Sequence, residues 1–220
     1  MSRIFSPTFR PLLLCVTALL AVACKSGSKP DPNRPTIDIP VTAISAIEAH
    51  EAISVKFVQS DAAPKITVTT RKDYVNNKDY VNNIDVKMVG TTLVAKYKNK
   101  RKVPENGVEV VITAPGINKI TATSAAIVNL GDECTLKDNL TISTNSAGSV
   151  KCRKLECYNL TLNASSASQI ILNNLNCHEI HAEASSLALI GLEGKATGAH
   201  VKEDTGAEVR CGQLTTTAGK

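Results

Sequence analysis

Hydrophobic residues recur with a period of about 20 from residue 118 onward. In each repeat, one apolar residue is followed two positions later by a second, and this period-two alternation is typical of a β-strand. The first such column contains Ile120, Leu140, Leu160 and Ile180, followed two residues on by Ala122, Ile142, Leu162 and Ala182, with Val201 continuing it. The pattern therefore predicts one short strand at the same place in every repeat.

Each repeat contains two further alternating segments. The second column contains Val128, Val150, Ile170, Ile190 and Val209, with Leu130, Cys152, Leu172, Leu192 and Cys211 two residues later. The third contains Cys134, Leu155 and Leu175 beside Leu136, Cys157 and Cys177. Three short strands per coil of about 20 residues predict an all-β, single-stranded parallel β-helix (β-solenoid), with equivalent strands about 4.8 Å apart. A helix is disfavoured because apolar residues do not recur at intervals of three and four.

Residues 41–117 are also rich in alternating segments, although their period is less clear. We expect them to form the first, less regular coils of the solenoid or a cap on it, ahead of the regular coils at 118–217. The hexapeptide KDYVNN occurs twice in succession, at 72–77 and 78–83. This duplication predicts a longer surface loop, and Tyr74 and Tyr80 would be its contact residues if the loop binds a ligand.

A small polar step separates the first and second strands of each repeat. The steps are Asn145-Ser146, Ser165-Ser166, Ser185-Ser186 and Asp204-Thr205. Short polar side chains tolerate tight conformations and hydrogen-bond to local backbone, so we expect ladders of them at one corner of the solenoid. A serine nucleophile would need a histidine base within reach, and none of these serines is distinguished from its stacked neighbours. No catalytic residue is predicted.

The N-terminus has the three parts of a secretory signal peptide: the basic residues Arg3 and Arg10, an apolar run over 12–22, and a small-residue end. The run is shorter than the roughly 20 residues that a membrane-spanning helix needs. The sequence LAVAC at 20–24 matches a lipobox, which predicts cleavage after residue 23 and lipidation of Cys24. The alternative is an ordinary secretory signal with a cysteine nearby by chance. Residues 24–40 are rich in proline and are predicted to tether the folded domain at 41–220.

A chain exported and anchored in this way is expected in the cell envelope, with the membrane as its first partner. Lys25, where a retention signal would have Asp, argues against the inner membrane and favours the outer membrane. The sequence leaves open whether the domain faces the periplasm or the cell surface. Removal of two basic residues with the signal peptide lowers the formal charge from +5 to +3. That charge is too small to indicate nucleic-acid binding.

Five cysteines follow Cys24, and all lie in the predicted apolar columns. Cys157 and Cys177 are equivalent positions on neighbouring coils, about 4.8 Å apart and within disulfide range. Either the cysteines are buried thiols acting as small hydrophobic residues, or these two form a disulfide, which export would permit. His181 and His200 face outward on neighbouring coils and, with Glu183, could bind a metal weakly, although stacked surface residues also produce such pairs incidentally. No cofactor is predicted.

Three segments indicate a family. They are AISAI at 43–47 with AISVKFVQ at 52–59, VEVVITAPGI at 108–117, and the serine-rich corners. In these the chain resembles the putative auto-transporter adhesin family with a head GIN domain, found among secreted and lipid-anchored proteins of Bacteroidetes. The resemblance covers roughly 43–217 and implies a right-handed β-helix-like fold without established enzymatic activity. The corners here are poorer in glycine than is usual in that family.

Three functions fit these features. The first, which we predict, is a non-catalytic envelope lipoprotein that acts as a scaffold or adhesin-like binding module. The second is a carbohydrate-active β-helix protein that binds or cleaves polysaccharide, an analogy of fold alone; the paired carboxylates of glycoside hydrolysis are absent from the outward columns. The third is an accessory subunit of an envelope sensing or assembly complex, whose partner, or a second copy, would pair with the C-terminal edge of the solenoid.

Overall fold

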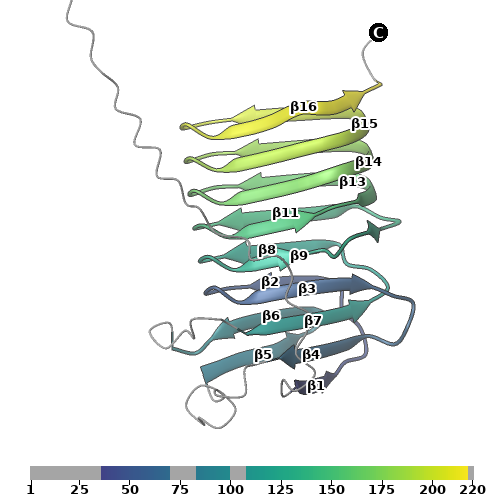
Figure 1. Cartoon of the computed structure of the whole chain (residues 1–220), viewed down its shortest axis with the longest axis vertical. Helices are drawn as coiled ribbons and strands as arrows, with labels where there is room; N and C mark the ends of the chain where they lie inside the picture. Colours follow the sequence, from purple (N-terminus) through teal and green to yellow (C-terminus); the bar gives the residue numbers. More distant parts are fainter. Residues whose placement is uncertain (1–35, 70–82, 100–107, 218–220) are drawn as a thin grey trace, which may run out of the picture. The chain divides into compact units, whose positions relative to one another are not determined.

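A computed structural model describes residues 36–69, 83–99 and 108–217, all within one compact unit over residues 33–220. Within these residues the chain forms a sheet of sixteen β-strands, β1 to β16, that winds into stacked coils. About five of the coils are regular, and they lie one above another in Figure 1. The predicted β-solenoid is therefore confirmed. In the part of the chain described, no helix has the length and apolar character needed to cross a membrane.

Each regular coil contains three strand segments that pair in parallel with their equivalents in the next coil. In the first regular coil they are β8 (Lys119–Thr123), β9 (Ile127–Asn129) and β10 (Cys134–Thr135). The next begins with β11 (Leu140–Asn145) and β12 (Ser149–Cys152). From there on, neighbouring segments run together into longer strands. β13 (Leu155–Ala164) joins a third segment to the first segment of the following coil, and β14 (Gln169–Ala184) and β15 (Leu189–Glu203) each join a second, a third and a following first segment. β16 (Glu208–Thr216) joins a second and a third segment.

The apolar columns fill the interior of the coils. Leu160 pairs in register with Leu140 on one side and Ile180 on the other, and all three side chains are fully buried. In the second column, Val150 lies between Val128 and Ile170. Each interior side chain is covered by the equivalent residues of the coils above and below, so burial of apolar area holds the coils together.

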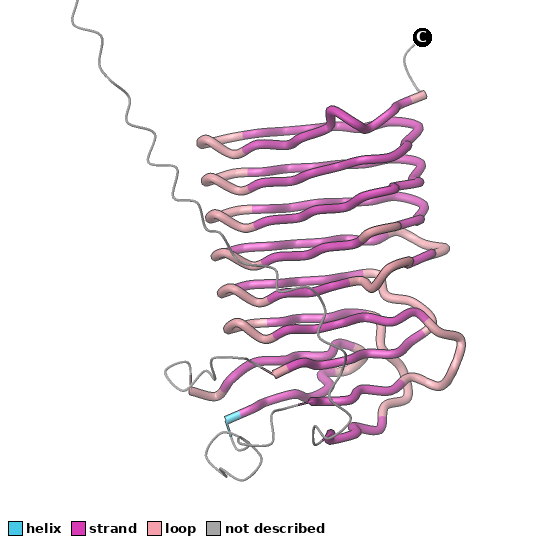
Figure 2. Tube along the Cα trace, in the orientation of Figure 1, coloured by secondary structure: helices cyan, strands magenta, loops and turns pink. Residues whose placement is uncertain are grey.

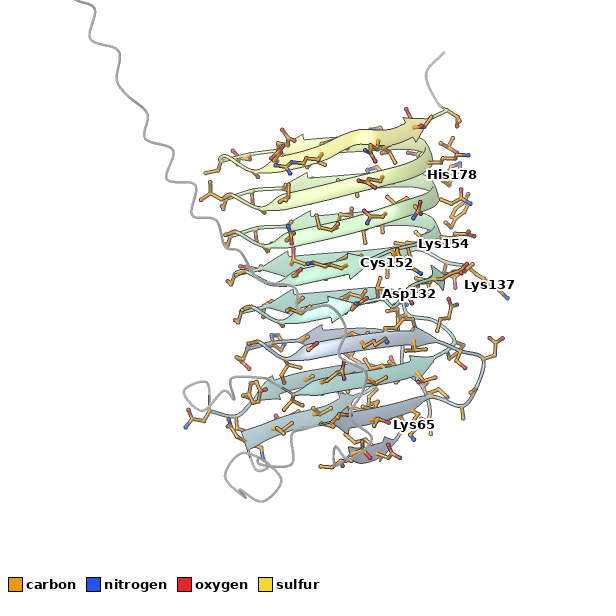
Figure 3. The ribbon with its side chains drawn as sticks, in the orientation of Figure 1. Lys65, Asp132, Lys137, Cys152, Lys154 and His178 are labelled. Carbon is orange, nitrogen blue, oxygen red and sulfur yellow. The ribbon has the colours of Figure 1, made fainter. Side chains whose placement is uncertain are left out.

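One predicted pairing is wrong. The period of 20 placed Ile120 beside Leu140, whereas in the structure Ile120 pairs with Ile142. The first regular coil is two residues longer than a strict period allows, since paired residues are 22 apart at Val128 with Val150, 21 apart at Cys134 with Leu155 and 20 apart at Leu140 with Leu160. One extra residue lies in the loop between β10 and β11, which contains Lys137, and the other lies in the loop between β9 and β10, which contains Asp132 (Figure 3). There Gly131 adopts a positive φ of 72°, and its N–H donates to Oδ1 of Asn129. An outward loop lengthens a coil without disturbing the stacked segments, which explains why the other columns keep their register.

The first two coils are stacked in the reverse of their chain order. β2 (Ala46–Ala49) and β3 (Ser54–Gln59) form one coil, and β6 (Thr92–Tyr97) with β7 (Glu109–Ala114) form another. β2 lies between β6 and β8, and β3 lies between β7 and β9, all in parallel. The chain thus builds the outer coil second and then passes the β2–β3 coil to begin β8, as Figure 1 shows.

Antiparallel strands close this end of the solenoid. β4 (Lys65–Thr69) pairs antiparallel with β7, and β5 (Ile84–Val89) pairs antiparallel with β6. β1 (Thr36–Pro40) pairs antiparallel with β4 and forms one edge of the sheet. This end of the solenoid therefore consists of two coils and an antiparallel cap.

The start of the folded domain differs from the expected boundary at residue 41. Residues 36–40, assigned to the tether, form β1, because Ile39 packs against the core and pairs with Ile66. Asp38 accepts a hydrogen bond from Thr67 and forms an ion pair with Lys65 at 2.9 Å. The signal segment and Cys24 lie outside the described residues, as does the duplicated hexapeptide, Tyr74 and Tyr80 included, apart from Asn83.

The polar steps form tight turns stacked along one edge of the solenoid, seen as loops in Figure 2. The two central residues of each turn have positive φ, as at Ser146 (50°) and Ala147 (62°), which is typical of a type I′ turn. The N–H of Gly148 closes its turn by donating to the carbonyl of Asn145. The N–H of Ala147 donates to the carbonyl of Ser166 in the next turn. The predicted corner ladder is confirmed, and its rungs are backbone hydrogen bonds.

Gln59 replaces a missing strand segment on the third face of the solenoid, which is the face formed by the third strand segment of each coil. The β2–β3 coil leaves the solenoid after Gln59, so β10 has no backbone neighbour from that coil on this side. The Gln59 side-chain amide accepts from the N–H of Thr135 at 2.6 Å and donates to the carbonyls of Thr135 (2.6 Å) and Pro115 (2.9 Å). The primary amide therefore takes the place of a peptide group between two coils.

The strained turns predict that glycine is stabilising at the second central position. Ala167 has a φ of 57° and is exposed. Ala167→Gly removes a steric penalty of about 1–2 kcal/mol and adds some unfolded-state entropy. We expect a net gain of about 0.5–1 kcal/mol in the free energy of unfolding, measured by denaturant titration. The control Ala164→Gly, within β13, should destabilise the protein. If both substitutions lowered the stability, the turn would not be strained by the Ala167 side chain.

The amide bridge predicts a loss of stability when Gln59 loses its hydrogen-bonding groups. Gln59→Leu keeps the approximate size but leaves two groups of Thr135 without this partner, at a cost of about 1–3 kcal/mol. Gln59→Glu should also be destabilising, because a carboxylate cannot donate to the two carbonyls. Chemical denaturation of both variants measures the effect. Gln169→Leu, on another face, is the matched control, and equal stability changes for Gln59 and Gln169 would argue against the bridge.

Candidate functional site

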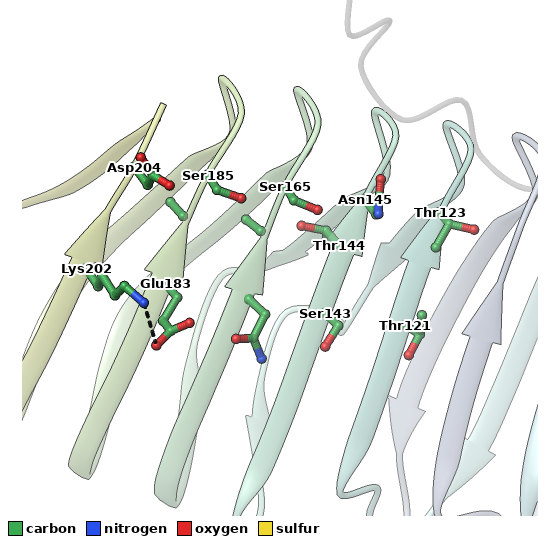
Figure 4. A pocket seen from close by; sticks show the side chains of 13 residues that line it. Thr121, Thr123, Ser143, Thr144, Asn145, Ser165, Glu183, Ser185, Lys202 and Asp204 are labelled. Carbon is green, nitrogen blue, oxygen red and sulfur yellow. Dashed lines mark ion pairs between the residues drawn. The ribbon is translucent and has the colours of Figure 1, made fainter. Parts of the chain in front are cut away.

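A groove of about 490 Å³ runs along the outward side of the first-strand segments, parallel to the solenoid axis (Figure 4). It crosses every regular coil, from β8 at one end to the end of β15 at the other. Because side chains alternate between the two faces of a strand, every second residue of these segments points outward into the groove. The structure therefore places one pair of outward side chains per coil in a single continuous site.

The lining consists of two parallel rows of mostly short polar side chains. The first row is in register through strand pairing and contains Thr121, Ser143, Asn163, Glu183 and Lys202. The second row lies two residues later, beside the turns, and contains Thr123, Asn145, Ser165, Ser185 and Asp204. Neighbouring members of a row are about 4.8 Å apart, the spacing between paired strands. The site is thus a regular grid of hydroxyl, amide and carboxylate groups.

The two ends of the groove differ in charge. Its lining side chains are uncharged over the first three regular coils, and charged groups enter at Glu183, Lys202 and Asp204. Nζ of Lys202 lies 3.9 Å from Oε1 of Glu183, and both side chains are more than half exposed. Such an ion pair is screened by water and contributes little to stability. With Asp204, the three charged groups give this end of the groove a net negative formal charge.

The second row extends beyond the groove into the β2–β3 coil. Nδ1 of His50 lies 2.7 Å from the hydroxyl oxygen of Thr123, within hydrogen-bond distance. Beside it, Glu48 pairs in register with Thr121 and so continues the first row. Neither Glu48 nor His50 was predicted to extend these rows, because the spacing between residues 48 and 121 does not follow the period of 20.

Inside the same corner, a buried polar pair supports the turns. The hydroxyl groups of Thr144 and Ser168 are 2.8 Å apart, and both residues are buried. The Ser168 oxygen also accepts from the N–H of Ser165. Because buried polar groups are costly unless they are hydrogen-bonded, this pair fixes the turn next to the groove.

The predicted metal trio is not brought together as a ligand set. The rings of His181 and His200 stack with centroids 4.9 Å apart and planes 14° from parallel, so their faces, not their nitrogens, meet. Glu183 forms its ion pair with Lys202, and Nε2 of His200 lies 3.9 Å from the carboxylate of Glu179. Over the ranges that the structure describes, no three histidine, cysteine or acidic residues are arranged to hold a metal ion.

A second aromatic stack lies where the third face meets the first. Tyr158 and His178 stack with centroids 5.1 Å apart and planes within 7°, and Tyr158 is 55% exposed. Next to them, the Glu179 carboxylate lies against Gly198, where an added Cβ would approach its oxygens to 2.5 Å. Glycine at this position therefore leaves room for the carboxylate.

The cysteines are free thiols inside the coils, with Cys211 only partly buried. The sulfur atoms of Cys157 and Cys177 lie 3.3 Å apart, a hydrogen-bond contact. That hydrogen bond and burial raise the pKa of the Cys157 thiol. Burial raises the pKa of Cys134 to about 12 and that of Cys152 to about 11. This arrangement is that of buried thiols acting as small hydrophobic residues; the oxidation state of the pair in the cell stays a prediction.

The C-terminal edge of the solenoid, where a partner or a second copy was expected to pair, is formed by β16. It pairs in parallel with β15 on one side, and no strand within the described residues pairs with its other side. Val201, an interior position of the last coil, is 45% exposed.

Three solved structures share this architecture. The chain is similar to a putative lipid binding protein from Parabacteroides distasonis, with a TM-score of 0.69, 15% identity, and coverage of 84% of this chain and 76% of that one. A putative adhesin from the same organism gives a TM-score of 0.71 and 15% identity over 84% and 75% of the two chains. A putative adhesin from Bacteroides fragilis gives a TM-score of 0.59 and 18% identity, and the match covers 84% of this chain and 99% of that one. At these identities the likeness establishes the fold. No curated protein matches the chain.

Stacked parallel coils with a polar outer groove define a β-solenoid protein. The chain belongs to the family described as "Putative auto-transporter adhesin, head GIN domain", whose model matches residues 43–218. The predicted family and the predicted extent of the resemblance, roughly 43–217, are confirmed. Membership of this family is consistent with a binding module and with a location in the cell envelope or at the cell surface.

Burial of the thiols predicts a strict order of reactivity. At pH 8 iodoacetamide should modify Cys211 first, because it is partly exposed, and should modify Cys134 and Cys152 at least about tenfold more slowly, since their raised pKa values keep them protonated. Mass spectrometry of timed samples measures the order. In denaturant without a reductant, all five should react; if Cys157 and Cys177 stayed unmodified, they would be joined as a disulfide.

Proposed function

We propose that the protein is a non-catalytic lipoprotein of the cell envelope, tethered through a lipid on Cys24, whose solenoid is an adhesin-like binding module. The observation that carries the binding role is the groove, in which one outward pair from each regular coil contributes to a single elongated polar surface. A rigid stacked scaffold holds these side chains in fixed register before any ligand arrives. Such preorganisation lowers the entropic cost of binding.

The composition of the groove supports binding without chemistry. Hydrolysis of a glycosidic bond needs two carboxylates on opposite sides of the bond. The groove holds the carboxylates of Glu183 and Asp204, which lie on neighbouring coils and at the same end, with Glu183 already facing Lys202. The turn serines that line it are repeated from coil to coil, so none is set apart as a nucleophile.

The anchor follows from the sequence and accords with where the folded domain begins. The first described strand starts at Thr36, so eleven residues separate Cys24 from the sheet. As an extended segment these residues reach at most about 35 Å. The groove would then lie within a short distance of the membrane surface, and the envelope layer next to that membrane would hold its ligand. The outer membrane is the membrane we propose.

Anchoring is tested in cells that produce the full chain. With a clickable fatty acid in the medium, the wild type should be labelled and should sediment with the membrane fraction. Cys24→Ser should lose both properties, because serine lacks the thiol that accepts diacylglycerol. Cys211→Ser is the matched control and should behave as wild type. Labelling that persists in Cys24→Ser would refute the anchor.

The binding role is tested with the same preparations in detergent. Immobilised wild type should retain polymer from a soluble extract of its own cell envelope, and the retained polymer should keep its length. Ser143→Trp, which fills the middle of the groove, should retain much less, as should Asn163→Lys, which introduces charge there. Shortening of the polymer would show catalysis. If both variants retained as much polymer as the wild type, the groove would not be the binding site.

A further inference from the structure

We propose that the ligand of this groove is an extended, uncharged β-1,4-linked glycan that lies along the solenoid axis with one sugar opposite each coil. This inference rests on the proposed binding function and names its ligand class. Three features of the groove carry it: the spacing of its rows, the hydrogen-bonding groups in them, and the distribution of charge.

The first feature is the spacing. The groove runs across the strands, so a ligand along its axis meets an equivalent pair of side chains at every coil. Coils are about 4.8 Å apart, which is close to the rise per sugar of an extended β-1,4-linked chain. Successive sugars of such a chain alternate in orientation, so each coil meets one sugar and every second coil meets the same edge of one, without bending of the chain. A peptide strand has a shorter rise per residue, about 3.3 Å, and would lose register within a few coils.

The second feature is the pair of rows. Ser143 and Asn145 are two residues apart on one strand, about 6.6 Å along it, and the next coil repeats the pair as Asn163 and Ser165. A pyranose ring lying between the rows presents hydroxyl groups at both of its edges. Hydroxyl and amide side chains can donate and accept, so they can match either role. An acyl chain would leave these groups without partners, which is costly.

The third feature is charge. Over the first three regular coils, the side chains that line the groove are uncharged. Its one cationic lining residue, Lys202, is paired with Glu183, and Asp204 adds a second acidic group beside it. A uronic-acid polymer would therefore meet no unpaired cation among these residues, and its carboxylates would lie near those of Glu183 and Asp204. An uncharged glycan avoids this repulsion.

The groove lining contains no aromatic side chain, so each sugar is held by hydrogen bonds and contributes little by itself. Ser, Thr and Asn side chains lose little rotamer entropy on binding compared with longer ones. Affinity should therefore accumulate with the number of sugars until the ligand spans the groove, which about five units accomplish, one for each regular coil. This length dependence distinguishes an axial glycan from a ligand that binds at one point.

The test measures binding of defined oligosaccharides to the full chain in mild detergent by calorimetry. The probes are cello-oligosaccharides and N-acetylated chito-oligosaccharides of two to eight units, with a β-1,4-linked hexamannuronate as the acidic probe. We expect the affinity for at least one uncharged series to rise with each unit up to about five and then to level off. Hexamannuronate should bind at least tenfold more weakly than the hexamer of that series, because it has the same linkage but carries carboxylates.

Variants locate the site. Ser143→Ala with Asn163→Ala removes two central groups and should weaken hexamer binding by about tenfold, since the sugars lose their hydrogen bonds to both side chains. Gln169→Ala with Asn176→Ala changes two outward residues on the other faces and should leave the affinity unchanged. Affinity that does not depend on length, tighter binding of the acidic probe, or an unaffected groove variant would each overturn the inference.

Failure here is distinguishable from failure of the proposed function. If Ser143→Trp abolishes retention of envelope polymer but neither uncharged series binds, the groove is a binding site for another ligand class and the glycan inference falls. If Ser143→Trp and wild type retain the polymer equally, the binding role of the groove itself falls.

Discussion

The whole structure depends on stacking in register. No coil covers its own apolar side chains, so Leu160 is buried only because Leu140 and Ile180 lie directly below and above it. The backbone hydrogen bonds of parallel strands set the distance between coils, and apolar burial makes that distance favourable. Departures from the regular period lie in the loops on either side of β10, in the cap, and in two irregularities where the pairing of β14 with β15 and of β15 with β16 shifts register.

The same constraint produces the outer surface. Residues that alternate with the buried columns are forced into equally regular outward rows, so the groove is an external consequence of internal packing. Stacking also brings like side chains face to face, as with His181 on His200 and Tyr158 on His178. In the histidine pair, stacking turns the ring faces, and not the nitrogens, toward each other. In the row from Thr121 to Asn163, stacking produces a uniform polar grid.

The structure could be predicted from the sequence where it is periodic. The apolar columns after Val128, the corner ladder, and the family were predicted, because repetition at fixed spacing is visible without coordinates. The positions of β2 and β6 were not, since strands that pair across 46 residues, as Ala46 does with Thr92, carry no common spacing. Gln59 was missed because its role depends on a strand segment that is absent. The two-residue extension of the first regular coil was visible in the second column, where Val128 and Val150 are 22 residues apart, but not in the first.

The order of the coils has a consequence for how the molecule can assemble. The coil formed by β2 and β3 comes first in the chain yet has neighbours on both sides, and both neighbours come from later residues. A chain emerging from its N-terminus therefore holds a half-built centre, with two open edges, until the strands up to β9 are available. Coils can therefore stack onto it in opposite directions, toward the cap on one side and the repeats on the other.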